Sequence, residues 1–183
     1  ISLLLNLKKN DEIIIPAHTY CASAISFARN GAKIIWADID FNTRVISEKD
    51  IIKKINKNTK AIVIVHLYGF MFDVLKLKRK INKRIKIIED CAQAFGAEIN
   101  SKKAGTLGDF SCFSFHAQKN LTTLGEGGAV YVKSNELAKL EAKIETNLSN
   151  HKRTLDFFQN NDFSKDSFTP RKVVASDRNE GRV

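Results

Sequence analysis

Short apolar runs alternate with amphipathic stretches from the start of the chain to about residue 146. Runs rich in isoleucine, valine, alanine or phenylalanine and bounded by polar residues are typical of buried strands. Six such runs span residues 11–16, 33–38, 61–66, 85–88, 110–115 and 129–132. Strands that alternate with helices predict a doubly wound α/β fold, in which a mostly parallel sheet forms the middle of three layers (α/β/α).

Four helices are predicted between and after these runs, because apolar residues recur there at helical spacing. Gly31 should end the first helix, and Ser47, Asp73 and Ser134 are suitable N-caps for the other three. Residues 1–7 are interpreted as the end of an earlier helix. The buried positions expected in the four helices are Ala22, Ile25, Phe27 and Ala28, then Ile51, Ile52 and Ile55, then Val74, Leu77 and Ile81, and finally Leu137, Leu140 and Ile144.

The character of the chain changes at about residue 147. Residues 147–183 are polar, mixed in charge and nearly without periodicity, so we expect one domain over residues 1–146 followed by a divergent or disordered tail. The first residue is an isoleucine and the only methionine is Met71. We therefore expect the chain to be a fragment of a longer protein.

Composition places the chain among soluble globular proteins. Its 183 residues are 43% hydrophobic and 27% charged, which is enough to bury one core. No apolar run approaches the roughly 20 residues that a membrane span needs, and no secretory leader is recognisable, so a cytoplasmic location without membrane contact is expected. Cys21, Cys91 and Cys112 show no C-x-x-C spacing, which favours reduced thiols.

The net charge of +10 raises the question of a nucleic-acid partner. The densest basic patch lies within residues 76–86. We interpret it as the solvated face of the helix that begins after Asp73, because no aromatic residue alternates with the basic ones to stack on bases. A nucleic-acid partner is therefore not expected.

Candidate chemistry lies at the ends of two of the predicted strands. Asp90 follows the run 85–88 at the edge where parallel sheets bind ligands, and its neighbour Glu89 should point to the opposite face. In the run 110–115, alternation puts Ser114 and His116 on one side. Lys119 follows as the chain turns, either as a reactive amine or as an ordinary surface lysine.

Two other site types find little support in the sequence. His18, His66 and His116 have no metal-ligand spacing such as H-E-x-x-H, so no metal site is expected. The fingerprint G-x-G-x-x-G is missing after the first strand, where a dinucleotide fold requires it. The glycines of residues 125–128 are better explained by a tight chain reversal than by a phosphate cradle.

Three motifs occur together in a fixed order. They read Ile-Glu-Asp-Cys-Ala-Gln-Ala at 88–94, Ser-Phe-His-Ala-Gln-Lys-Asn at 114–120 and Gly-Glu-Gly-Gly at 125–128. Together they resemble the DegT/DnrJ/EryC1/StrS sugar aminotransferases, which use pyridoxal 5'-phosphate (PLP) and have the large domain of PLP-dependent transferase fold type I. The resemblance covers roughly residues 3–146. It implies that residues 147–183 replace the small C-terminal domain, and that the family's phosphate-binding turn would precede Ile1.

The resemblance implies a role for each of five residues. Lys119 would form the Schiff base with PLP and act as the catalytic residue. Asp90 would pair with the pyridine nitrogen, and Gln93 would bond the 3'-oxygen of the cofactor. Ser114 would contact the phosphate, and Tyr20 would stack on the pyridine ring.

The implied function is transfer of an amino group from glutamate or glutamine to a nucleotide-linked keto-sugar. Such products serve surface polysaccharide, lipopolysaccharide or antibiotic sugar synthesis, and the full-length enzyme would be a homodimer. One alternative is a catalytically inactive remnant or interaction protein that keeps only the sheet. Another is a sugar dehydratase of the same family, but such relatives replace the lysine by histidine, so Lys119 favours transamination.

Overall fold

The computed structural model describes residues 1–132 and the backbone of residues 174–175. Its strands are β1 (Glu12–Pro16), β2 (Lys33–Ala37), β3 (Thr59–Val65), β4 (Lys86–Asp90), β5 (Glu98–Ile99), β6 (Lys102–Lys103), β7 (Phe110–Ser114), β8 (Gly128–Val132) and β9 (Val174–Ala175). Its helices are α1 (Ala22–Arg29), α2 (Glu48–Lys54), α3 (Val74–Lys78) and the short 3-10 turn η1 (Leu67–Gly69). The helix predicted after Ser134 and most of the predicted tail lie outside the described residues.

Seven strands form one sheet in the order β2-β1-β3-β4-β7-β8-β9. Neighbouring strands from β2 to β7 are parallel, β8 is antiparallel to β7, and β9 is parallel to β8. The chain leaves β1 for β2 on one side and returns to β3 on the other. In open α/β sheets, ligands bind beyond the carboxyl ends of the strands at such a change of direction.

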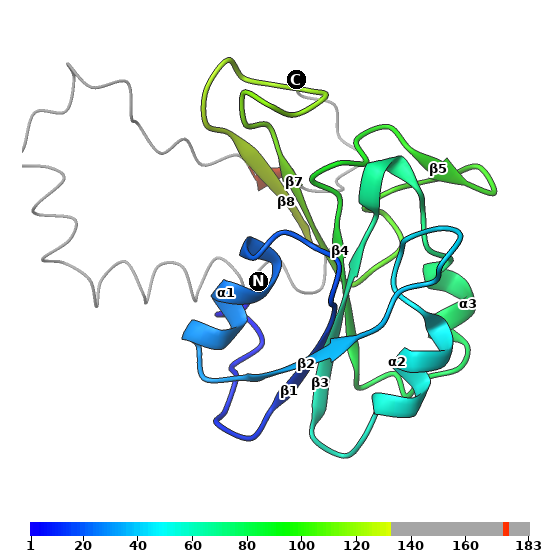
Figure 1. Cartoon of the computed structure of the whole chain (residues 1–183). Helices are drawn as coiled ribbons and strands as arrows, with labels where there is room; N and C mark the ends of the chain where they lie inside the picture. Colours follow the sequence, from blue (N-terminus) through cyan, green and yellow to red (C-terminus); the bar gives the residue numbers. More distant parts are fainter. Residues whose placement is uncertain (133–173, 176–183) are drawn as a thin grey trace, which may run out of the picture.

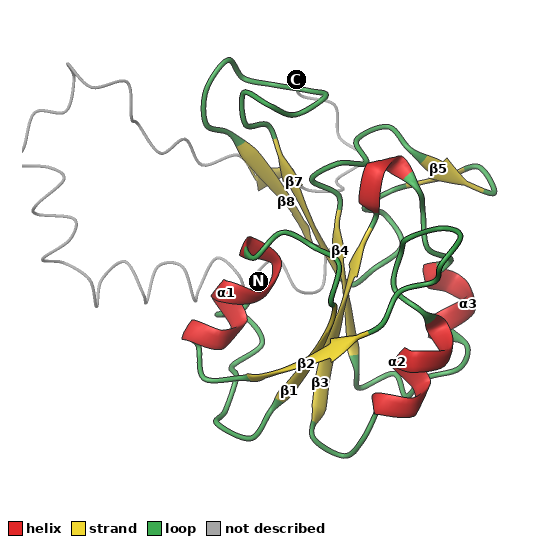
Figure 2. Ribbon diagram, viewed as in Figure 1, coloured by secondary structure: helices red, strands yellow, loops and turns green. Residues whose placement is uncertain are grey.

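Helix α1 covers one face of the sheet, whereas α2 and α3 cover the other (Figure 1, Figure 2). The connection from β1 to β2 runs along the sheet in the opposite direction to the next two connections. Right-handed crossovers therefore place its helix on the opposite face. This arrangement confirms the predicted α/β fold with its mostly parallel sheet.

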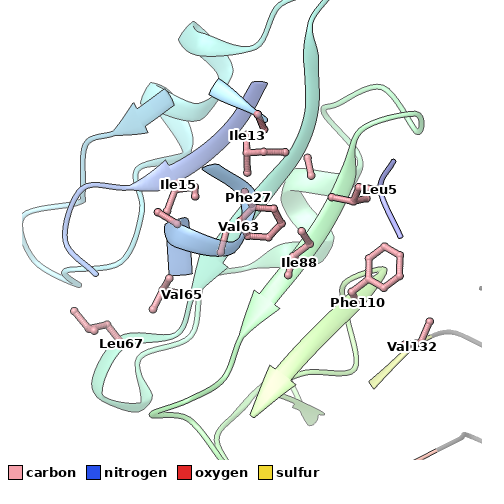
Figure 3. Close-up of a cluster of buried hydrophobic side chains, with 13 residues drawn as sticks. Leu5, Ile13, Ile15, Phe27, Val63, Val65, Leu67, Ile88, Phe110 and Val132 are labelled. Carbon is pink, nitrogen blue, oxygen red and sulfur yellow. The ribbon is translucent and has the colours of Figure 1, made fainter. Parts of the chain in front are cut away.

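The unbroken isoleucine run of β1 is explained by burial on both of its faces. Ile13 and Ile15 pack into the core cluster beside α1, which Figure 3 shows, and Ile14 packs into the cluster beside α2 and α3. Side chains of a strand alternate between faces, so one short run contributes to both clusters. Phe27 of α1 and Phe110 of β7 are the aromatic members of the first cluster.

The predicted ends of the helices are largely confirmed. The hydroxyl oxygen of Ser47 accepts from the backbone N–H of Asp50 (3.3 Å), and a carboxylate oxygen of Asp73 accepts from that of Lys76 (2.8 Å). Gly31 follows the end of α1 with a φ of +87°, a left-handed conformation that glycine adopts without steric cost. These local signals were readable because each acts within one helical turn.

The buried stripe of α1 was predicted wrongly. Of the four positions expected to be buried there, Phe27 is buried, whereas Ala22, Ile25 and Ala28 are exposed. Ile25 keeps 48% of its surface exposed. An eight-residue helix that lies on a sheet presents a narrow stripe, which here consists of Ala24 and Phe27 one turn apart.

The predictions for α2, α3 and the first residues also need correction. Ile52 is 42% exposed although Ile51 beside it is buried. Helix α3 ends at Lys78, so Ile81 packs against the core from the loop that follows. Residues 1–7 form hydrogen-bonded turns instead of a helix end, and Asn6 interrupts them with a left-handed φ of +50°.

The segment between β4 and β7 is rich in turns, as predicted, and contains the antiparallel β5–β6 hairpin. In the part of the chain that the structure describes, no helix has the length and apolar character needed to cross a lipid bilayer.

Candidate active site

A cavity of about 660 Å³ lies at the carboxyl ends of the parallel strands. Its lining comes from the segments that follow β1, β3, β4 and β7, within residues 19–23, 65–67, 90–93 and 114–126. Ligand pockets commonly measure about 300–1,000 Å³. The cavity therefore has the size and the position expected of a small-molecule site in this type of sheet.

All five residues singled out from the sequence line this cavity. They are Tyr20, Asp90, Gln93, Ser114 and Lys119. They come from three segments that lie far apart along the chain and meet because β1, β3, β4 and β7 lie side by side. His116 lines the cavity as well, whereas His18 and His66 do not.

Asp90 is the last residue of β4 and is held at both of its carboxylate oxygens. The hydroxyl of Ser23 donates to Oδ2 (2.7 Å), and the backbone N–H of Ala92 donates to Oδ1 (3.1 Å). On the neighbouring strand, burial and, to a smaller extent, the negative charge of Asp90 raise the pKa of the Cys112 thiol to about 12. Cys112 therefore stays protonated at neutral pH.

Glu89 points to the opposite face of β4, as predicted, and is completely buried there. It accepts hydrogen bonds from Nε2 of His66 (2.8 Å) and from the backbone N–H groups of Gly105, Leu107 and Gly108. Burial alone would raise the pKa of Glu89, but the bonds from His66 and from the backbone outweigh burial and lower it. Glu89 is therefore an ionised structural carboxylate outside the cavity.

His66 follows the last residue of β3, but its ring is fully buried and does not line the cavity. Its Nδ1 accepts from the backbone N–H of Phe72 (3.3 Å), so the proton lies on Nε2 and is donated to Glu89. Cys91 lies near enough for the three side chains to resemble a metal-ligand set. The donors around Glu89 explain the cluster as a hydrogen-bonded support for the segment from Gly105 to Gly108.

Gln93 is oriented by the chain that follows β3. Its Oε1 accepts from the backbone N–H of Tyr68 (3.1 Å). Because that backbone group can only donate, the oxygen of the amide must face it. The amide nitrogen Nε2 of Gln93 is thereby left as the donor of this side chain.

Ser114 and His116 share one side of the chain at the end of β7, as predicted, and both line the cavity. Nδ1 of His116 accepts from the backbone N–H of Gln118 (3.2 Å), so its Nε2 carries a proton toward Glu126 (3.3 Å). This pair connects the two ends of the link between β7 and β8. Within residues 1–132, the hydroxyl of Ser114 makes no hydrogen bond with another residue.

Lys119 is half-buried in the same link, and its backbone N–H donates to the carbonyl oxygen of His116 (2.9 Å). Its ammonium group forms no ion pair or hydrogen bond with any residue that the structure describes. Tyr20 remains 75% exposed, which leaves its ring accessible beside the cavity. The arrangement thus offers an amine, a fixed carboxylate, an amide donor, a hydroxyl and an aromatic ring around one space.

Sequence reasoning missed Thr19, Ser23 and Glu126, which also line the cavity. Ser23 lies in the first turn of α1, whereas Thr19 lies in the bend before its N-cap Cys21, so helical spacing does not account for their contact. No local signal in the sequence marked this pair or Glu126, because their contacts depend on how the segment after β1 and the link between β7 and β8 fold.

Comparison with known proteins gives consistent matches over most of this chain. The sequence profile of the DegT/DnrJ/EryC1/StrS aminotransferase family matches residues 2–163. The GDP-perosamine synthase of Vibrio cholerae is 41% identical over 132 residues, which are 72% of this chain and 36% of the synthase. The dTDP-3-amino-3,6-dideoxy-alpha-D-galactopyranose transaminase of Aneurinibacillus thermoaerophilus is 42% identical over 150 residues, which are 81% of this chain and 41% of the transaminase.

Solved structures agree with these sequence matches. The PLP form of a protein from Streptococcus pneumoniae that is described as a sugar aminotransferase superposes with a TM-score of 0.67 at 28% identity. The superposition covers 80% of this chain and 43% of the other. This chain therefore spans about two fifths of the length of the relatives that it matches.

Proposed function

This chain belongs to the DegT/DnrJ/EryC1/StrS aminotransferase family, and on that premise we propose that it serves PLP-dependent transfer of an amino group from glutamate or glutamine to a nucleotide-linked keto-sugar. The names of its relatives support the acceptor class, since one makes a GDP-linked and another a dTDP-linked amino sugar. The proposal includes a homodimer and a role in polysaccharide or related sugar synthesis. It concerns the whole protein and rests on the cavity that residues within 19–126 line.

The observation that carries the proposal is that Asp90 and Lys119 line the same cavity. A carboxylate and an amine that line one cavity could form an ion pair with each other. Here the carboxylate is held by Ser23 and Ala92, and no described residue pairs with the amine. A ligand that needs both groups would explain why they remain apart.

The donor set of the cavity fits PLP. When bound, PLP supplies an aldehyde that condenses with amines and a ring that withdraws electrons from the carbon next to the nitrogen. Asp90 can accept a hydrogen bond from the protonated ring nitrogen, and Nε2 of Gln93 can donate to the 3'-oxygen. The hydroxyl of Ser114 can donate to a phosphate oxygen, and the exposed ring of Tyr20 can stack.

Lys119 supplies the amine for attachment and the base for proton transfer. With PLP bound, Nζ of Lys119 would be the group that takes a proton from the substrate carbon next to the nitrogen, holds it and gives it back to the substrate. Such positioned general acid and base catalysis contributes about 10²–10⁴-fold to a rate. The lack of an ion pair at Nζ among the described residues leaves its lone pair available after deprotonation.

The two alternatives predict different chemistry. A dehydratase of this family would carry histidine in place of Lys119, so the lysine disfavours it. A non-catalytic remnant or interaction protein would bind no PLP at Lys119.

We expect purified protein mixed with PLP and then reduced with sodium borohydride to carry a pyridoxyl group on Lys119. Borohydride converts the bond between a lysine amine and the cofactor aldehyde into a stable link, which peptide mass spectrometry can place. Lys119→Ala should abolish this label. Lys102→Ala, at an exposed lysine in the β5–β6 hairpin, should retain it. Labelling spread over surface lysines in both variants would contradict the proposal.

A further inference from the structure

Three side chains form a chain of hydrogen bonds from the segment after β1 to the end of β4. Oγ1 of Thr19 lies 2.8 Å from Oγ of Ser23, and Oγ of Ser23 lies 2.7 Å from Oδ2 of Asp90. All three residues line the cavity. These hydrogen bonds connect the first turn of α1 to β4, which is the second strand from β1 in the sheet.

Elementary hydrogen-bond chemistry fixes the direction of this chain. A carboxylate can only accept, so the single hydrogen of the Ser23 hydroxyl goes to Asp90. Ser23 then has no hydrogen left for Thr19, so the Thr19 hydroxyl must donate to Ser23. Each hydroxyl in turn makes the next a better donor, because hydrogen bonds in a chain polarise one another.

The two hydrogen bonds to Asp90 fix its carboxylate but leave some of its acceptor sites unused. Oδ2 accepts from Ser23 and Oδ1 accepts from the backbone N–H of Ala92. A carboxylate has about four acceptor sites, so about two of them are left for a ligand in the cavity. Because both oxygens are anchored, the plane of the carboxylate is also fixed.

We propose that Ser23, supported by Thr19, is a positioning residue that keeps the Asp90 carboxylate correctly oriented for the ring nitrogen of PLP. This inference rests on the proposed function. The charge-assisted bond from Ser23 holds Oδ2 of Asp90 in place. Without that bond the carboxylate can rotate, so its contact with the protonated ring nitrogen of the cofactor weakens and it stabilises the proton on that nitrogen less.

The test compares PLP binding by Ser23→Ala, Ser23→Thr, Thr19→Val and Ser26→Ala variants of the full chain. Ser26 is an exposed serine one turn along the same helix, so its variant controls for the change in helix propensity. Dissociation constants come from titration of cofactor absorbance. Nitrogen NMR of isotopically labelled PLP reports, as a function of pH, whether the ring nitrogen carries a proton.

We expect Ser23→Ala to weaken PLP binding about tenfold, the loss that corresponds to one hydrogen bond to a charged group. Its ring nitrogen should also lose its proton at a lower pH than in wild type. Thr19→Val should have a smaller effect in the same direction. Ser23→Thr, which keeps the hydroxyl, and Ser26→Ala should both resemble wild type.

Two results would overturn the inference while the proposed function stands. One is wild-type affinity and ring-nitrogen protonation in Ser23→Ala. The other is weaker binding with unchanged protonation of the nitrogen, because that pattern indicates only a structural role. Failure of the wild-type chain to take up PLP at Lys119 would instead reject the proposed function and this inference with it.

Discussion

The two adjacent carboxylates at the end of β4 have different roles because their surroundings differ. Glu89 accepts hydrogen bonds from four donors on the face toward Gly105 and Leu107. Asp90 faces the cavity and accepts hydrogen bonds from two donors. The alternation of the strand decides which carboxylate meets which surroundings. Glu89 thereby stabilises the segment that leads into β7, and Asp90 remains able to accept from a ligand.

Glu89→Gln is expected to lower the free energy of unfolding by about 1–3 kcal/mol for each donor left without an acceptor at neutral pH, because a glutamine amide cannot accept all the hydrogen bonds that the buried carboxylate accepts. The glutamine amide would also present donors to backbone N–H groups that need an acceptor. Urea denaturation of the full chain measures the change. Glu98→Gln, at an exposed residue of the β5–β6 hairpin, should change it by no more than about 0.5 kcal/mol.

The pH dependence of the Glu89 contribution has a definite sign. In the folded chain the pKa of Glu89 lies below its ordinary value of 4.5, so the unfolded chain binds this proton more readily. The stabilisation is complete above pH 4.5 and is lost as the pH falls through the lower, folded pKa. The difference in unfolding free energy between wild type and Glu89→Gln should therefore shrink in acid, and a constant difference would contradict this account.

At the scale of elements, the link between β7 and β8 positions Lys119 through close packing. The hydroxyl oxygen of Thr123 lies 3.2 Å from the carbonyl oxygens of both Phe115 and Glu126, so the two acceptors share its single hydrogen within this link. A methyl group on Gly127 would lie 2.4 Å from that hydroxyl oxygen, whereas Gly125 has no atom within 4 Å of the equivalent position. Neither glycine has a positive φ, so space alone distinguishes them.

Gly127→Ala should therefore displace Thr123 and loosen the link, while Gly125→Ala should be tolerated. The expected result for Gly127→Ala is faster amide exchange at Phe115, whose N–H donates to the carbonyl oxygen of Gly127 (2.7 Å). Its PLP affinity should fall about tenfold or more, because small displacements of a site residue have large effects. Equal exchange and equal affinity in the two variants would show that the link does not control Lys119.

At the scale of the whole molecule, the sheet separates two apolar clusters. Helix α1 covers one cluster, and α2 and α3 cover the other. Ile13 and Ile15 belong to one cluster and Ile14 to the other. The central strands β1 and β3 therefore contribute to both clusters. The stability of this part of the chain depends on close packing in both clusters, because protein interiors contain few voids.

Ile14→Ala is expected to cost about 2–5 kcal/mol in the free energy of unfolding, because Ile14 is fully buried and the change leaves a cavity. Ile52→Ala is the matched control, since the exposed Ile52 of α2 loses little burial and alanine favours the helix. It should remain within about 0.5 kcal/mol of wild type. Equal costs in urea denaturation would contradict the assignment of the two residues.

The sequence by itself determined the features that depend on neighbours along the chain. These are the positions of the strands, the caps at Ser47 and Asp73, the opposite directions of Glu89 and Asp90, and the motifs that indicated the family. Local spacing records which face a residue occupies, and each of these features lies within one strand or one turn. The buried faces of the helices were less predictable, because packing against the sheet decides which face of a helix is covered.

Only the tertiary structure decided which segments meet. The place of β1 between β2 and β3 brings Tyr20 to the same cavity as Asp90 and Lys119, and it brings Ser23 within hydrogen-bond distance of Asp90. The bond between His66 and Glu89 arises in the same way, since β3 lies beside β4. Such contacts depend on strand order, which periodicity along the chain does not record because the pattern of one strand carries no information about which strands lie beside it.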